Sequence, residues 1–362
     1  MKQFKFNKNV LQTRPYKLPS LKPNKIHLDL NESFVNIANN DEQCIYPRDK
    51  QIHDACINEI SKYAKCMPSN VLLTNGSDNA LRYIFSLLCH DGSHTLVITP
   101  TYNQVYTFLS MNNAQFTNKN VIENDVIPLY NDLVNAVKNG LDDINPDVVY
   151  ICNPNNPLGY VLSCQTIEMF LSLYNTTVFI IDEAYMEYCE PYQSMTHLIN
   201  KYENLVITKT FSKGFGLAGI RLGFIIANTT MIEYIKNIYN EKDVLDISKR
   251  SGTKALQNLD FYATQFKIVR IVQTFTLTSI QAIIKTYPNG NIYLARGDQG
   301  GFIQLFLHDC IIFEKHMDDI GFVVRNRNDQ VKDMVRVQIG TLQSMSIFVD
   351  ACRSHNYITF FK

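Results

Sequence analysis

The chain has 362 residues, and its 34 basic and 34 acidic residues balance to a formal net charge of zero, with no long run of one sign. This balance argues against nucleic acid or an anionic membrane surface as the main partner. No stretch approaches the roughly 18 consecutive apolar residues of a membrane-spanning helix, and no hydrophobic region follows the basic N-terminus. We therefore expect no membrane span and no signal peptide.

The length allows one large α/β domain and a smaller one. Residues 1–28 are expected to form an irregular arm, because Pro15, Pro19 and Pro23 interrupt it; such an arm suits packing on another surface, for example that of the small domain. Residues 29–245 are expected to form the large domain, where alternating apolar strands and helices predict a mainly parallel sheet covered on both faces. The expected strands span residues 71–73, 95–99, 147–152, 177–182, 205–209 and 221–227, and the expected helices span residues 51–64, 78–88, 103–111, 129–138 and 164–174.

Residues 246–362 are expected to form the smaller α+β domain, because the pattern changes after about residue 240. A long helical stretch comes first, and short strands and two further helices follow it. The helices are expected at residues 253–287, 310–319 and 343–355, and the strands at residues 291–296, 301–307, 322–326 and 335–339.

The nine cysteines are scattered and form no C-x-x-C pair. This usage favours reduced thiols in a cytoplasmic protein over a disulfide framework or a zinc site. His90 and His94 are four residues apart, but Gly92 between them indicates a loop, and no H-E-x-x-H motif occurs. We therefore expect no metal centre.

Lys213 lies between a predicted strand and a glycine-rich loop. A lysine on such a rigid edge can be desolvated, which lowers the pKa of its amine and lets it form a Schiff base. Ser212 and Arg221 flank it and are suited to binding a phosphate. A lysine beside a phosphate site indicates pyridoxal phosphate (PLP), although the same segment fits a second pattern.

That second pattern is the dinucleotide fingerprint G-x-G-x-x-G, formed by Gly214, Gly216 and Gly219. The fingerprint should follow a strand and open a helix whose N-terminus binds the pyrophosphate. Here residues 220–227 are predicted to be another strand, so the sequence offers no helix N-terminus. This context argues against a nicotinamide cofactor.

Further polar segments follow the predicted strands, at the edge where parallel sheets bind ligands. Asn75-Gly76-Ser77-Asp78 opens a helix, so its amides and hydroxyl are suited to a phosphate, although helix capping alone would also explain it. Residues 153–159, Asn-Pro-Asn-Asn-Pro-Leu-Gly, form either a plain turn or one that directs an amide at a ligand. Asp182 ends a very apolar strand, and burying its carboxylate requires a cation, such as a protonated pyridine nitrogen, or a cap or salt bridge. Tyr185 is suited to donating to a phenolic oxygen of the ring.

The order of these segments resembles the fold type I PLP aminotransferases, and within them the histidinol-phosphate aminotransferase family. The resemblance spans nearly the whole chain. It implies the fold type I architecture, in which a large PLP-binding domain has a mainly parallel seven-stranded sheet covered by helices and a small α+β domain accompanies it. The matching segments include Leu30-Asn31-Glu32, Tyr46-Pro47, Asp182-Glu183-Ala184-Tyr185, Thr210-Phe211-Ser212-Lys213, Gly219-Ile220-Arg221-Leu222-Gly223 and residues 335–341, Val-Arg-Val-Gln-Ile-Gly-Thr.

This resemblance implies a role for each matching residue at the cofactor. Lys213 would form the Schiff base and carry the proton between Cα and C4′, Asp182 would pair with the pyridinium, and Tyr102 would stack on the ring. Asn156 and Tyr185 would contact the ring oxygen. The cofactor phosphate would be held by Ser77, the Asp78 amide, Thr210, Ser212 and Arg221.

The same resemblance implies a homodimer with shared active sites, because Tyr46 matches a tyrosine that reaches the phosphate across the dimer interface. Arg336 matches the arginine that binds the acidic end of both substrates, with Asn156 nearby. Arg325 and Tyr16 are the expected helpers at the substrate phosphate. An arginine fork suits carboxylate and phosphate alike.

The departures from the family pattern lie on the substrate side. Residues 33–40 contain neither Pro nor Gly, and Gln299-Gly300-Gly301-Phe302 stands where Ala-Asn-Phe is expected. We expect transamination between glutamate and a small phosphorylated keto-alcohol or amino-alcohol, either like histidinol phosphate or smaller. The alternatives are a PLP decarboxylase of phosphothreonine or phosphoserine, and a binding module without catalysis.

Overall fold

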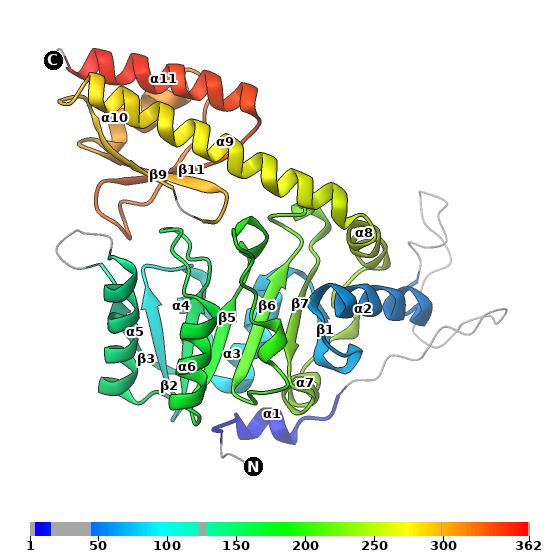
Figure 1. The fold of residues 1–362 in the computed structure, drawn as a ribbon. Helices are drawn as coiled ribbons and strands as arrows, with labels where there is room; N and C mark the ends of the chain where they lie inside the picture. Colours follow the sequence, from blue (N-terminus) through cyan, green and yellow to red (C-terminus); the bar gives the residue numbers. More distant parts are fainter. Residues whose placement is uncertain (1–3, 16–44, 123–127, 298, 361–362) are drawn as a thin grey trace.

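The computed structural model describes residues 4–15, 45–122, 128–297 and 299–360 (Figure 1). Its larger sheet has seven strands in the order β1-β7-β6-β5-β4-β2-β3, and β7 runs in the direction opposite to the other six. This arrangement confirms the predicted fold type I class. The strands are β1 (Val71–Thr74), β2 (His94–Thr99), β3 (Gln115–Asn120), β4 (Val148–Cys152), β5 (Val178–Asp182), β6 (Leu205–Thr210) and β7 (Gly223–Ala227).

Helices cover both faces of this sheet (Figure 1). Successive strand residues point to opposite faces; Phe179 and Ile181 of β5 belong to the apolar cluster under α2, α5 and α6, whereas Val178 and Ile180 belong to the cluster under α3, α4 and α7. The buried strands therefore read as continuous apolar runs. The helices are α2 (Lys50–Ala64), α3 (Gly76–Leu88), α4 (Gln104–Met111), α5 (Tyr130–Ile144), α6 (Cys164–Leu173) and α7 (Thr229–Lys236), and the short 3-10 turns are η2 (Pro68–Asn70), η3 (Met186–Tyr188), η4 (Thr196–Leu198), η5 (Ala218–Ile220) and η6 (Glu241–Asp243).

The described part of the N-terminal arm, residues 4–15, contains the short helix α1 (Lys8–Gln12) and packs on the large domain. The ring of Phe6 lies 4.8 Å from that of Tyr234 on α7, and the Asn7 amide donates to the Leu87 carbonyl of α3 at 2.8 Å. The expected association of the arm with the small domain stays a prediction, since residues 16–28 lie outside the described residues.

The C-terminal part of the chain forms a four-stranded antiparallel sheet in the order β10-β11-β9-β8, with two long helices against it (Figure 1). The expected division after residue 245 remains a prediction; α8 follows it and packs against α2, and Ala255 and Leu256 join the large-domain core. The elements are α8 (Asp246–Leu256), α9 (Leu259–Thr286), β8 (Ile292–Arg296), β9 (Phe302–Leu307), α10 (Cys310–Asp319), β10 (Arg325–Asn326), β11 (Met334–Gln338) and α11 (Leu342–Phe360).

Several predicted elements need correction. The helical stretch expected at residues 253–287 is two helices, because Asn258 leaves the helical conformation (φ −119°, ψ 39°) between α8 and α9. The strand expected at residues 322–326 is only the two residues of β10. The sequence analysis missed α1, α7 and β3, and β3 was hard to find because it is a polar, largely exposed edge strand.

Candidate active site

A pocket lies at the carboxyl ends of β4, β5 and β6, at the edge of the large sheet that faces the small domain (Figure 1). It brings together ten of the eleven residues predicted to bind the cofactor. Cys152 and Ala184 also line it, and sequence reasoning missed both. The lining residues are Ser77, Asp78, Tyr102, Cys152, Asn156, Asp182, Ala184, Tyr185, Thr210, Ser212, Lys213 and Arg221.

The acid of the pocket is Asp182, the last residue of β5, whose side chain is 3% exposed. Burial raises the pKa of this carboxyl, although three donors oppose the shift: the Tyr150 hydroxyl at 3.0 Å, the Thr208 hydroxyl at 3.1 Å and the Ala184 amide at 3.2 Å. Within the described part of the chain, no lysine or arginine lies at ion-pair distance from it. A buried carboxylate that has hydrogen bonds but no ion-pair partner is stabilised by a bound cation. A protonated ring nitrogen is a cation of this kind.

The amine of the pocket is Lys213, in the loop after β6, with Nζ 5.5 Å from the centre of the Tyr185 ring. The side chain reaches the pocket surface, but the surrounding protein atoms displace enough water to lower the pKa of the amine, and Arg336 lowers it further. A lowered pKa gives more of the neutral amine, which is the form that attacks a carbonyl carbon.

An anion cradle lies at the N-terminus of α3. Gly76 has φ +75°, and a Cβ atom there would stand 2.6 Å from the Arg221 guanidinium, so glycine permits this close approach. The guanidinium of Arg221 donates to the Ser212 hydroxyl at 3.4 Å and lies 3.6 Å from the Asp78 carboxylate. Free helix amides, hydroxyls and a guanidinium together fit a phosphate.

The small domain adds a second cationic group above the pocket. Arg336 on β11 donates to the Asn156 side-chain oxygen, and its guanidinium lies 5.3 Å from the centre of the Phe302 ring. Arg325 on β10 lies opposite Arg336 in the antiparallel strand register, but its side chain is exposed. A third arginine, Arg327, is buried close to Arg336, and it was not among the predicted site residues.

One predicted site residue, Tyr46, lies away from the pocket, and a second, Tyr16, is not described by the structure. Tyr46 is 40% exposed and is not among the residues lining the pocket; the Lys242 amine lies 4.2 Å from the centre of its ring. Tyr16 lies outside the described residues.

Behind the pocket, a buried ionic cluster joins β5 to β6. Lys209 is 1% exposed, and its amine lies 3.1 Å from the Glu183 carboxylate and 2.9 Å from that of Glu187. Burial alone would lower the pKa of this amine, but Glu187, Tyr192 and Glu183 outweigh burial and raise it. Sequence reasoning did not find this cluster, although Glu183 follows Asp182 directly.

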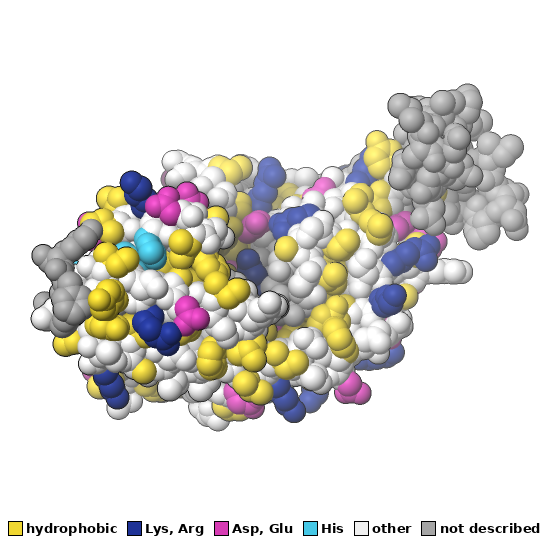
Figure 2. All heavy atoms as spheres, turned by 90° about the horizontal axis from the view of Figure 1, so that it is seen from above, with side chains coloured by type: hydrophobic (Ala, Val, Ile, Leu, Met, Phe, Trp, Pro, Cys, Tyr) yellow, Lys and Arg dark blue, Asp and Glu magenta, His cyan; other side chains and the backbone are white. Residues whose placement is uncertain are grey.

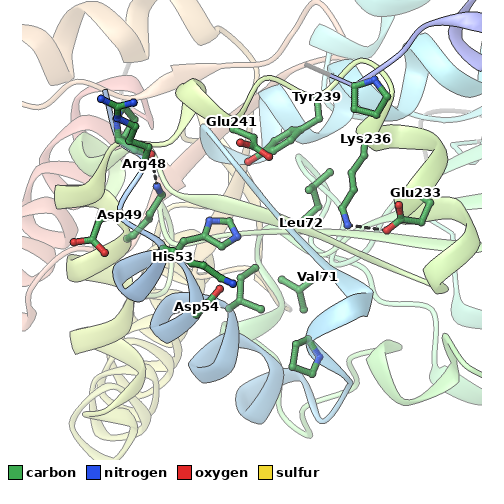
Figure 3. Close-up of a pocket in the computed structure, with 16 residues that line it drawn as sticks. Arg48, Asp49, His53, Asp54, Val71, Leu72, Glu233, Lys236, Tyr239 and Glu241 are labelled. Carbon is green, nitrogen blue, oxygen red and sulfur yellow. Dashed lines mark hydrogen bonds and ion pairs between the residues drawn. The ribbon is translucent and has the colours of Figure 1, made fainter. Parts of the chain in front are cut away.

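A larger cavity of about 550 Å³ lies between α2, β1 and α7 and does not coincide with this chemistry (Figure 3). Among the residues of its wall, Lys236 forms an ion pair with Glu233 at 2.7 Å, and Lys249 forms one with Asp246 at 2.8 Å. Burial, followed by the charge of Lys249, lowers the pKa of His53 in its wall.

The face seen from above in Figure 2 mixes basic, acidic and apolar side chains. Among the described residues, no helix is long and apolar enough to cross a membrane.

The fold and the pocket define a PLP-dependent transferase of fold type I, since a lysine, a buried acid and an anion cradle meet at the carboxyl edge of the sheet. The family model described as aminotransferase class I and II matches residues 23–270, and the chain belongs to this family. The predictions of an aminotransferase and of PLP as its cofactor are thereby confirmed.

Known relatives support this assignment. The chain is 29% identical over 368 residues to a histidinol-phosphate aminotransferase of Christiangramia forsetii, covering 97% of this chain and 98% of the relative. It is 26% identical to a dihydroxyacetone phosphate transaminase of Campylobacter jejuni, covering 94% of both chains. A histidinol-phosphate aminotransferase structure from Clostridium acetobutylicum has a TM-score of 0.74 at 21% identity, covering 87% of this chain and 91% of the other. A structure of L-threonine-O-3-phosphate decarboxylase from Porphyromonas gingivalis has a TM-score of 0.69 at 18% identity, covering 85% and 92%, so the fold is common to both reactions.

Proposed function

We propose that this chain transfers an amino group between glutamate and a small phosphorylated keto-alcohol or amino-alcohol. The observation that carries the proposal is the convergence of Lys213, Asp182 and the α3 cradle under Arg336. When bound, PLP supplies an aldehyde that condenses with amines and a cationic ring that withdraws electrons from the bonds at Cα.

The residues of the chain orient this cofactor and move the proton. Ser77, Ser212 and Arg221 would hold its phosphate, and Asp182 would keep its ring nitrogen protonated. Lys213 would hold its aldehyde carbon through the amine and would move the proton at the substrate Cα. The lowered pKa of Lys213 favours the neutral amine, which is the form that accepts a proton.

Four further residues of the pocket would contact the cofactor. Tyr102, whose hydroxyl donates to Asp78 at 2.8 Å, would stack on the ring, and the Asp78 amide and Thr210 would complete the phosphate cradle. Asn156 and Tyr185 would contact the ring oxygen, and burial raises the pKa of Tyr185 to about 12, which keeps its hydroxyl protonated as a donor.

Substrate selection belongs to the small domain. We propose that Arg336 binds the carboxylate of glutamate and the acidic end of the second substrate, and that Asn156 helps to position both. Tyr16 and Arg325 remain proposals as helpers at the substrate phosphate. The names of the two relatives above point to substrates of different size. Histidinol phosphate is an amino alcohol with an imidazole ring, whereas dihydroxyacetone phosphate is a three-carbon ketone.

Two properties of the whole enzyme belong to the same proposal. The exposed position of Tyr46 suits a homodimer in which this ring reaches the partner's site. A cytoplasmic location fits the cysteines, since those of the described residues are free thiols.

The test is spectral. Glutamate alone should convert the visible absorbance of the PLP-loaded protein to that of the pyridoxamine form, and 2-oxoglutarate should appear in equal amount. The pyridoxamine form should then react with imidazole acetol phosphate or with dihydroxyacetone phosphate, and the faster ketone identifies the substrate class. Release of carbon dioxide from phosphothreonine, without conversion by glutamate, would identify a decarboxylase instead.

A further inference from the structure

Three donors hold the carboxylate of Asp182, and two of them are hydroxyl groups on the neighbouring strands. Thr208 stands directly opposite Asp182 where β6 pairs with β5, and its hydroxyl donates to Oδ1 at 3.1 Å. Tyr150 lies on β4, two residues before Cys152, the partner of Asp182 in the strand register, and its hydroxyl donates to Oδ2 at 3.0 Å. The Ala184 amide donates to Oδ1 at 3.2 Å. The sheet itself therefore fixes the plane of this carboxylate.

These donors leave one acceptor position of the carboxylate open. An ionised carboxylate accepts about four hydrogen bonds, two at each oxygen. Among the described residues, Oδ1 of Asp182 accepts two, from Thr208 and Ala184, whereas Oδ2 accepts one, from Tyr150. The open position is therefore on Oδ2. Because Asp182 lines the cofactor pocket, Oδ2 is the oxygen suited to accept from a ring N–H.

The hydroxyl of Tyr150 is not required for packing. The side chain is 0% exposed and belongs to the apolar cluster under α3, α4 and α7, with its ring 6.0 Å from that of Phe85. A phenylalanine would fill nearly the same volume without a polar atom to remove from water. Burial, and then the charge of Asp182, raises the pKa of Tyr150, so its hydroxyl stays protonated as a donor. The polar atom of this side chain is thus explained by the carboxylate that it contacts.

Tyr150 and a bound ring nitrogen would share the same oxygen of Asp182. A hydrogen bond to an ionised carboxylate stabilises that form, so each donor makes Asp182 a weaker base. Burial acts in the opposite direction and raises the pKa of this carboxyl. Without the two hydroxyl groups, Asp182 would compete with the ring nitrogen for the proton between them. With them, Asp182 leaves that proton on the nitrogen.

We propose that Tyr150 and Thr208 are positioning residues that keep Asp182 ionised, direct its Oδ2 at the ring nitrogen of the cofactor, and so set how strongly the cofactor withdraws electrons. Tyr150 has the larger share, because it donates to the oxygen that also meets the nitrogen. Thr208 acts through Oδ1 and mainly fixes the plane of the carboxylate. The inference concerns the cofactor that the family uses and needs none of the proposed substrates.

The test is the ¹⁵N magnetic resonance of PLP labelled at the ring nitrogen, which distinguishes a protonated from a neutral nitrogen in the loaded protein. Tyr150→Phe should move the resonance toward that of a neutral ring, and Thr208→Val should move it less. Thr208→Ser keeps a hydroxyl and should match the wild type. The matched control is Tyr239→Phe, which alters a buried tyrosine in the wall of the cavity between α2, β1 and α7 and should also match the wild type.

An unchanged resonance in Tyr150→Phe, or an equal shift in Tyr239→Phe, would overturn the inference. Urea midpoints and the visible absorbance of the cofactor check that the variants fold and load. If Tyr150→Phe does neither, the contrast between Thr208→Val and Thr208→Ser decides, and equal resonances in that pair would overturn the inference as well.

The rate at which glutamate converts the cofactor separates this inference from the proposed function. Tyr150→Phe should slow the conversion about 10- to 100-fold, the loss expected for one hydrogen bond to a charged group. Failure of glutamate to convert the wild type, with a resonance that still depends on Tyr150, would reject the proposed function and leave the role of Tyr150 standing.

Discussion

Replacing Lys209 by methionine should strongly destabilise the protein, because it leaves the buried carboxylates of Glu183 and Glu187 without their cation. The three side chains are at most 3% exposed, and the two amine–carboxylate distances are 3.1 and 2.9 Å. Removing one partner of such a buried cluster costs about 3–5 kcal/mol. With a urea dependence of about 3 kcal/mol per M, the unfolding midpoint should fall by about 1–2 M.

The loss should extend to the cofactor, because the cluster joins the two chain segments that carry the catalytic groups. Glu183 follows Asp182, and Lys209 lies four residues before Lys213. We therefore expect Lys209→Met to bind PLP more weakly, as measured by the loss of cofactor absorbance on dialysis. Lys209→Arg keeps the charge and should recover most of the stability and the binding.

Urea unfolding of matched variants tests the expected loss of stability. The control is Lys201→Met, which removes the amine of an exposed pair with Glu168 at 2.5 Å and should leave the midpoint nearly unchanged. Lys209→Met combined with Glu187→Gln should be more stable than Lys209→Met alone, since one uncompensated charge is gone. Equal midpoints for Lys209→Met and Lys201→Met would refute the reasoning.

Three further substitutions test individual groups of the pocket. Asp182→Asn should slow glutamate-dependent conversion of the cofactor by a factor that corresponds to about 2–5 kcal/mol, as for a truncated buried charge pair, and a normal rate in stopped-flow absorbance would contradict the pairing. Arg336→Gln removes a positive charge that disfavours protonated Lys213, so the pKa of that amine should rise and spectral titration should show PLP attachment shifted to higher pH; a shift to lower pH would contradict the sign. Gly76→Ala would place a methyl group 2.6 Å from the guanidinium of Arg221 at φ +75°, so equilibrium dialysis should show weaker PLP binding, and unchanged affinity would argue against the cradle.

The sequence predicted the cofactor side of the pocket well for a physical reason. Short polar segments after apolar strands are recognisable locally, and the geometry of a parallel sheet brings them to one edge. Asp182, Lys213 and Ser77 were found in this way, and the structure places them in one pocket.

The buried charged groups around the pocket were predicted less well, because their positions depend on contacts between distant segments. Nothing near Arg327 indicates that β10 ends after Asn326, that Gln330 of the following turn donates to the Thr101 carbonyl, or that the arginine is buried. Lys209 likewise finds Glu183 through the pairing of β5 with β6, 26 residues away in the chain. Periodicity alone does not reveal such pairs.

The most direct test of the central claim is the reaction of glutamate with the PLP-loaded protein, followed by absorbance in a stopped-flow instrument, for the wild type and for Lys213→Ala. The account predicts conversion to the pyridoxamine form with one equivalent of 2-oxoglutarate in the wild type. In Lys213→Ala, which keeps the phosphate cradle, the cofactor should remain bound and conversion should be slowed by about 10²-fold or more, as expected for loss of a general base. Conversion at the wild-type rate in Lys213→Ala would contradict the account.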